Sequence, residues 1–140
     1  MDKIEIKNIL FTLGADLCGV ASIDRFDGAP KGFHPLDVMP SCQSVISFAC
    51  RFPVGTLRCK SAVPYTHVRN SMTPKLDAIA MDFCIEMEKH EIVCVPIPTN
   101  ESLFAPEVIR TDVSTFMARY FPCFLFLVIA KCMVPAIKLL

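Results

Sequence analysis

Apolar residues recur along this chain with a helical spacing in some segments and as short continuous runs in others. Residues 2–13 carry one apolar helical face, and Gly14 stands where such a helix ends. That face consists of Ile6, Ile9, Leu10 and Leu13. The same spacing predicts a helix over roughly residues 74–89 and a further one over about 107–120, with Pro122 ending it.

The continuous apolar runs predict strands that are buried on both faces. They cover residues 17–21, 44–50 and 92–97, and Pro96 predicts an edge or the end of the third. Residues 22–42 carry glycines and prolines and are predicted to be mostly loop. Because helices and strands alternate, the fold class is α+β with an α/β-like order, a sheet covered by helices.

A polar stretch at residues 63–77 separates two apolar segments and is the first candidate for a functional site. Its candidate side chains are Tyr65, His67, Arg69 and Asn70. Thr73 is predicted to cap the next helix, with Pro74 in its first position and Asp77 in its first turn. A helix N-terminus exposes N–H groups that attract an anion. The alternative is an ordinary surface loop before a well-capped helix, which is the commoner case.

A second polar group, Thr99, Asn100 and Glu101, follows the predicted strand 92–97. In open α/β sheets, ligands gather outside the carboxyl ends of strands, so these residues are also site candidates. Near the C-terminus, residues 123–130 form an apolar run that is interrupted by Lys131. A spanning helix needs about 20 apolar residues, and a lysine is costly at mid-bilayer. The run is expected to be a buried strand or a partner-facing segment.

Composition narrows the classes of function. The 140 residues fit one domain, and the zero net charge gives no electrostatic case for nucleic acid or an anionic membrane. The hydrophobic fraction of 53% and mean hydropathy of +0.47 leave apolar surface for a partner, another domain or a membrane.

The eight cysteines show no C-x-x-C spacing, which disfavours a zinc site or a redox motif. The first residues contain no secretory signal, so a cytoplasmic location and reduced thiols are expected. A cluster assembled from distant cysteines stays open.

Five segments together resemble the N-terminal region of the epoxyqueuosine reductase-like family of cobalamin and iron–sulfur proteins, over roughly residues 5–110. The segments are LGADLCGVA (13–21), FDGAPKG (26–32), MPSCQSVISF (39–48), PYTHVRN with KLD (64–70 and 75–77), and VPIPTNE (95–101). The resemblance implies a nitroreductase-like α+β fold and a corrinoid-binding-type domain over residues 1–110. Residues 111–140 are then a divergent helix plus an apolar segment.

The resemblance also implies a cobalamin site. Tyr65, His67, Arg69 and Asn70 would line a pocket at the end of the sheet, with Asn100 facing them. The family's C-x-x-C-x-x-C cluster motif is absent, so no iron–sulfur cluster is expected in this chain. A truncated or divergent paralogue that does not catalyse on its own would have this pattern. The alternatives are a non-catalytic interaction module that docks or self-associates through its C-terminal apolar run, and a small membrane-anchored protein.

Overall fold

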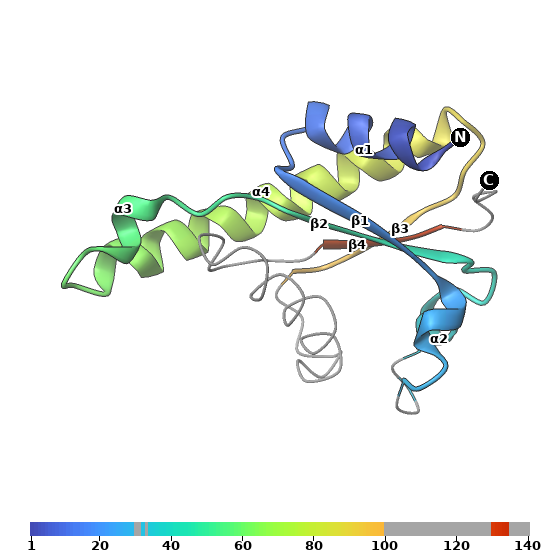
Figure 1. Ribbon diagram of the computed structural model, residues 1–140, viewed down its shortest axis with the longest axis horizontal. Coiled ribbons are helices and arrows are strands. Elements are labelled where there is room, and N and C mark those ends of the chain that lie inside the picture. Colours follow the sequence, from blue (N-terminus) through green and yellow to red (C-terminus); the bar gives the residue numbers. More distant parts are fainter. Residues whose placement is uncertain (30–31, 33, 100–129, 135–140) are drawn as a thin grey trace.

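A computed structural model describes residues 1–29, 32, 34–99 and 130–134 of the chain. Figure 1 shows how the described elements are arranged. In chain order they are α1 (Lys3–Thr12), β1 (Leu17–Ser22), the 3₁₀ helix η1 (Ile23–Phe26), α2 (Pro35–Val38), β2 (Ser44–Ala49), α3 (Val54–Leu57), α4 (Val63–Glu88), β3 (Val95–Ile97) and β4 (Ala130–Val134).

The strands form one four-stranded sheet in the order β1-β2-β4-β3, and all neighbouring pairs are antiparallel. Strand β4 lies between β2 and β3, with Ile46 of β2 paired to Cys132 and Ile97 of β3 paired to Lys131. Since β2 and β3 both run against β4, they run in the same direction. Their carboxyl ends therefore lie at the same edge of the sheet. The presence of helices together with this antiparallel sheet confirms the mixed α+β class.

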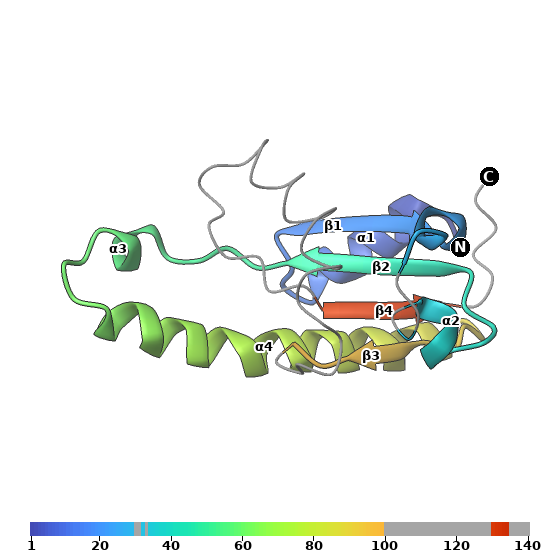
Figure 2. The same ribbon diagram turned by 90° about the horizontal axis from the view of Figure 1, so that it is seen from below.

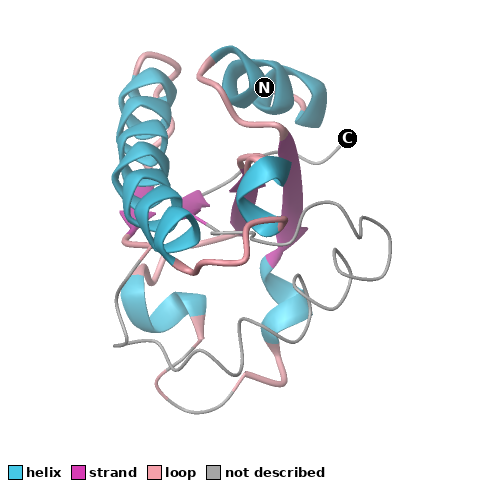
Figure 3. Ribbon diagram, turned by 90° about the vertical axis from the view of Figure 1, so that its left-hand side faces the viewer, coloured by secondary structure: helices cyan, strands magenta, loops and turns pink. Residues whose placement is uncertain are grey.

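Helices α1 and α4 cover one face of this sheet (Figures 1 and 3). The core between the layers is fully enclosed. It includes Ile6 and Leu10 of α1, Ile46 and Phe48 of β2, and Leu76, Ile79, Phe83 and Met87 of α4. Residues two apart on a strand share a face, so Val45 points to the other side of β2. There it packs in a smaller cluster with Met39 and Cys42.

The first helix forms as its apolar spacing predicts. Asp2 caps it, because its Oδ1 accepts hydrogen bonds from the backbone N–H groups of Ile4 and Glu5, each at 2.8 Å. The Glu5 carboxylate accepts in return from the Asp2 N–H at 2.7 Å. After the helix Gly14 has a φ of +103°, a conformation that glycine adopts without strain.

The predicted loop over residues 22–42 contains two short helices, η1 and α2. In α2 the ring nitrogen Nδ1 of His34 accepts from the Leu36 N–H at 3.2 Å, and Asp37 accepts from the His34 N–H at 3.0 Å. Four residues are too few to show a helical period, so spacing alone does not identify such an element.

The largest departure from the sequence prediction is at residues 63–73, which are helix and not loop. They form the first part of α4, a helix of 26 residues that continues through Pro74. The Thr73 hydroxyl does not cap anything; it donates to the Arg69 carbonyl at 3.2 Å within the helix. The ring of Pro74 is exposed, while the buried Thr73 and Leu76 on either side hold this part of the helix against the sheet. The helix starts instead at Val63, with Pro64 in its first turn, where proline needs no N–H partner.

The third predicted strand is shorter than expected, because only Val95–Ile97 forms β3. Pro96 lies in its middle, which suits an edge position, since among the described strands β3 pairs on one side only. Most of the apolar run 123–130 and the helix predicted over 107–120 lie outside the described residues. The strand that follows, Ala130–Val134, includes Lys131 and pairs on both sides within the chain's own sheet. Among the described helices, none has the length and apolar character needed to cross a bilayer.

The packing of α4 on the sheet predicts opposite results for two neighbouring substitutions. Phe83 has 0% of its surface exposed, so Phe83→Ala should lower the free energy of unfolding by about 3–5 kcal/mol. The exposed Asp82 is the control, and Asp82→Ala should change it by about 0.5 kcal/mol or less. Urea unfolding followed by circular dichroism measures both values, and similar losses in the two variants would contradict this packing.

Candidate functional site

The first ten residues of α4 extend beyond the end of the sheet (Figures 1 and 2). This part, residues 63–72, is called the arm below. None of the side chains in the arm is buried. The buried side chains of α4 begin at Thr73 and include Leu76 and Phe83, which are seven residues apart. The arm starts near α3 and lies beyond the edge of the sheet where β2 and β3 end. It contains the predicted site residues of the polar stretch.

Helical geometry divides the four predicted site residues between two sides of the arm. Tyr65 and Arg69 are four residues apart and therefore neighbours on one side. They precede the buried Leu76 and Ala80 by eleven residues, about three turns, so they continue the row of residues that faces the sheet. His67 and Asn70 are three residues apart and lie on the opposite side.

The sheet-side flank of the arm consists of Tyr65, Val68, Arg69 and Met72. The ring of Tyr65 packs against Phe52, with centroids 5.4 Å apart and planes tilted by 38°. Phe52 is buried and comes three residues after the end of β2, so this contact joins the arm to the segment that leaves the carboxyl end of that strand. Val68 and Met72 are half-buried and Arg69 is exposed. The flank thus combines apolar surface with a phenol and a guanidinium group.

A second connection joins α4 to the end of β3. The Asp77 Oδ1 atom accepts a hydrogen bond from the Thr99 N–H at 3.0 Å and another from the Thr99 hydroxyl. Thr99 comes two residues after β3, so the pair holds the strand end on the helix. Asp77 was expected in the first turn of a helix; it lies in the middle of one, and its carboxylate accepts from Thr99. Asn100 and Glu101 lie outside the described residues.

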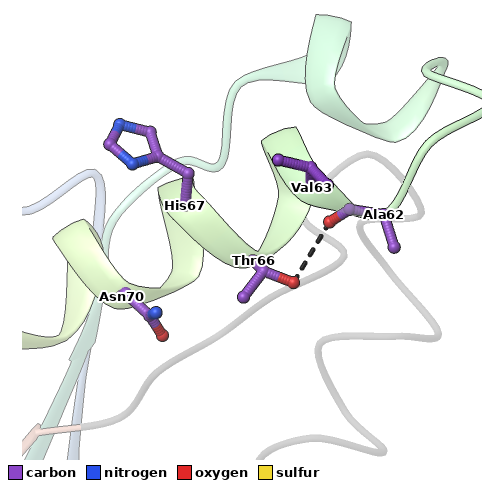
Figure 4. Close-up of a pocket in the computed structure, with 5 residues that line it drawn as sticks. All are labelled: Ala62, Val63, Thr66, His67 and Asn70. Atoms are coloured by element: carbon purple, nitrogen blue, oxygen red, sulfur yellow. Dashed lines mark hydrogen bonds between the residues drawn. The ribbon is translucent and has the colours of Figure 1, made fainter.

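The outer flank of the arm carries an open pocket of about 390 Å³, lined by Ala62, Val63, Thr66, His67 and Asn70 (Figure 4). The Thr66 hydroxyl donates to the Ala62 carbonyl at 3.1 Å, so His67 and Asn70 supply the side-chain polarity of the pocket. Sequence reasoning missed Ala62, Val63 and Thr66, which follow from the i, i+3, i+4 spacing once the segment is recognised as helix. This volume is near the lower end for drug-sized ligands, and a corrinoid is larger than those.

The predicted anion site at Thr73 is wrong, because no helix begins there. The helix N-terminus is at Val63, whose N–H donates to the Ser61 hydroxyl oxygen at 3.2 Å. Tyr65, His67, Arg69 and Asn70 remain the candidate site residues. Their arrangement is that of a continuous helix and not of a loop.

The cysteines within residues 1–99 are free thiols, and most of them are buried. Burial raises the pKa of Cys18 to about 11 and also raises the pKa of Cys50. A hydrogen bond with Cys84, together with burial, raises the pKa of Cys94. These three thiols are therefore protonated at neutral pH and poor as nucleophiles or metal ligands. In the residues that the structure describes, no three His, Cys, Asp or Glu side chains are grouped to hold a metal ion.

Comparison with known proteins identifies no relative of this chain. No protein-family model, no curated protein and no solved structure matches it. The resemblance to the epoxyqueuosine reductase-like family therefore stays a prediction that rests on the five segments quoted above.

The difference in burial predicts that the exposed Cys59 thiol reacts much faster than the buried thiols. Among the cysteines within residues 1–99 only Cys59 is exposed, so of these it should react first with a thiol reagent in the native protein at pH 7–8. Cys59→Ser should remove one equivalent of fast reaction, while Cys50→Ser should leave the fast phase unchanged. In denaturant without reductant, all eight cysteines of the wild-type chain should titrate. Loss of the fast phase in Cys50→Ser, or a denatured count near zero, would contradict this assignment.

Proposed function

We propose that this chain is a corrinoid-binding module of the epoxyqueuosine reductase-like type, with a nitroreductase-like sheet, that binds cobalamin without catalysing a reaction by itself. The order and spacing of the five matching segments support the class. The placement of Tyr65 and Arg69 supports the site, because both lie on the flank of the arm that continues the sheet-facing row of α4. The carboxyl ends of β2 and β3 share the neighbouring edge, and Phe52 and Thr99, which follow these two strands, both contact α4.

The side chains of the sheet-side flank fit the chemistry of a corrinoid. The macrocycle is apolar on its faces and carries amides on its rim, so it needs an apolar floor and hydrogen-bonding groups beside it. Val68 and Met72 offer apolar surface, and Arg69 offers five N–H donors for amide oxygens or a phosphate. The outer pocket fits less well, because it is small and lined mainly by one helix.

A bound corrinoid supplies a redox-active cobalt ion, and the chain's own contribution is to bind and orient the macrocycle. In this proposal Tyr65 and Arg69 hold one side of the rim. The contact between Tyr65 and Phe52 keeps the phenol ring in place before the ligand arrives. The Asp77–Thr99 hydrogen bonds keep the end of β3 next to the same helix, so the edge of the site is fixed from two strands.

The two flanks of the arm give this proposal a matched test. Arg69→Ala should weaken cobalamin binding by roughly tenfold to over a hundredfold, because a charge-assisted hydrogen bond contributes about 1.5–3 kcal/mol. His67→Ala, two residues away on the opposite flank, should leave the affinity within about twofold. Titration calorimetry with cobalamin measures both, and circular dichroism checks that the variants are folded.

The outcomes separate the parts of the proposal. Equal losses in Arg69→Ala and His67→Ala would overturn the assignment to the sheet-side flank. A wild-type chain that binds no cobalamin would overturn the function itself.

A second candidate function, a non-catalytic interaction module, is favoured by exposed apolar side chains on the outer side of α4. Val63, Met81 and Ile85 are 74%, 53% and 54% exposed. The C-terminal segment was the expected docking surface, but its described strand, Ala130–Val134, pairs within the chain's own sheet. The outer side of α4 is therefore the better candidate for docking.

A further inference from the structure

The exposed residues on the outer side of α4 form one straight row along the whole helix. The row, called the outer stripe, consists of Val63, His67, Asn70, Pro74, Ala78, Met81 and Ile85, all of them exposed. Positions 63, 74 and 85 are eleven residues apart, a repeat of 3.67 residues per turn that stays close to straight along an α-helix. The row lies opposite the core face, and most of its members are apolar.

The spacing of the outer stripe is the same when read in either direction. Its successive intervals are 4, 3, 4, 4, 3 and 4 residues, with Pro74 at the centre. Two α4 helices that meet antiparallel about a two-fold axis at Pro74 would therefore align their stripes position by position. Val63 would then lie opposite Ile85 of the second copy, and Asn70 opposite the small Ala78.

These pairings are complementary in character. Val63 and Ile85 are the two β-branched apolar residues at the ends of the stripe, about 33 Å apart along the helix. Each end of the contact would be an apolar pair. His67 would lie opposite Met81, whose flexible thioether packs well against an aromatic ring. The small side chain of Ala78 leaves room for the Asn70 side chain opposite it.

Charge is complementary at the ends of the same arrangement. Glu88 follows Ile85 by three residues at the end of α4, and Lys60 precedes Val63 by three in the bend that leads into α4. Both side chains are exposed. In an antiparallel dimer, Lys60 of each copy would approach Glu88 of the other, twice. Antiparallel helices also place the positive end of one helix dipole near the negative end of the other.

The outer stripe is accessible in the described part of the molecule. Figures 2 and 3 place α4 at a margin of the described elements, with the sheet to one side of it. Two copies can approach along this margin without disturbing the packing of α4 on the sheet. The sheet-side flank with Tyr65 and Arg69 lies on the other side of the helix, so dimerisation leaves it open.

We propose that the partner of this chain is a second copy, bound through the outer stripes of two antiparallel α4 helices related by a two-fold axis near Pro74. The proposal rests on the second candidate function, the interaction module, and supplies its partner. It is independent of corrinoid binding, because the two surfaces lie on opposite flanks of one helix. A two-fold contact of this kind uses the same patch on both copies, which the reversible spacing of the stripe allows.

Sedimentation velocity of the full chain over a range of concentrations tests this proposal. The wild-type chain should sediment as a dimer at high concentration. Ile85→Glu places a charge in the apolar end pair and should raise the dimer dissociation constant at least tenfold. Ile4→Glu is the matched control, since Ile4 is 67% exposed but belongs to α1, and it should leave the dimer intact. Circular dichroism should show the same helix content in all three proteins.

A charge exchange tests the antiparallel register. Lys60→Glu should weaken the dimer by bringing like charges together, and Lys60→Glu combined with Glu88→Lys should restore it. Absence of rescue in the double variant would overturn the antiparallel register.

A wild-type chain that stays monomeric at every concentration would overturn the dimer, while cobalamin titration still decides the corrinoid proposal separately. A dimer that survives Ile85→Glu would overturn pairing through the outer stripe, yet it would keep the interaction-module function through another surface. Dimers that Ile85→Glu dissociates and Ile4→Glu does not would support the proposal.

Discussion

The burial of one face of α4 against the sheet is the constraint on which the rest of this structure depends. Leu76, Phe83 and Met87 are enclosed between the sheet and α1, so the rotation of α4 about its axis is fixed. A helix extends cooperatively once a stable part exists, because each added residue gains a hydrogen bond without a new nucleus. The anchored half thereby sets the direction of every side chain on the arm, including those that lack any buried contact.

Two kinds of segment explain how much the sequence could predict. Helix α1, strands β1 and β2 and the second half of α4 have apolar patterns that their own packing requires, so spacing identifies them. The arm has no such pattern, since none of its side chains is buried, and it is helical as the continuation of the half that carries Leu76 and Phe83. Thr73 and Pro74 look like a helix start in sequence, and only tertiary packing shows that they are internal. The pairing of β4 between β2 and β3 joins residues far apart in the chain, which local patterns do not encode.

The continuity of α4 through residues 63–73 changes how the candidate site is understood. In a loop, Tyr65, His67, Arg69 and Asn70 could converge on one ligand, and the sequence prediction placed them together. In a helix they separate, with Tyr65 and Arg69 toward the sheet and His67 and Asn70 away from it. Sequence reasoning could select these residue types but not their sides, because the sides follow from the secondary structure. One helix thus presents two distinct surfaces, one proposed to hold a corrinoid rim and one proposed to bind a second copy.

Backbone chemical shifts of residues 63–77 test this account most directly. If α4 is continuous from Val63 to Glu88, the ¹³Cα shifts of residues 64–77 should show helical values without interruption, apart from local effects at Pro74. Amide contacts between residues i and i+3 should then cross the Thr73–Pro74 position. Random-coil shifts up to Thr73, with helical values beginning only at Pro74, would contradict the account, because they would restore the loop and remove the division of the site between two flanks.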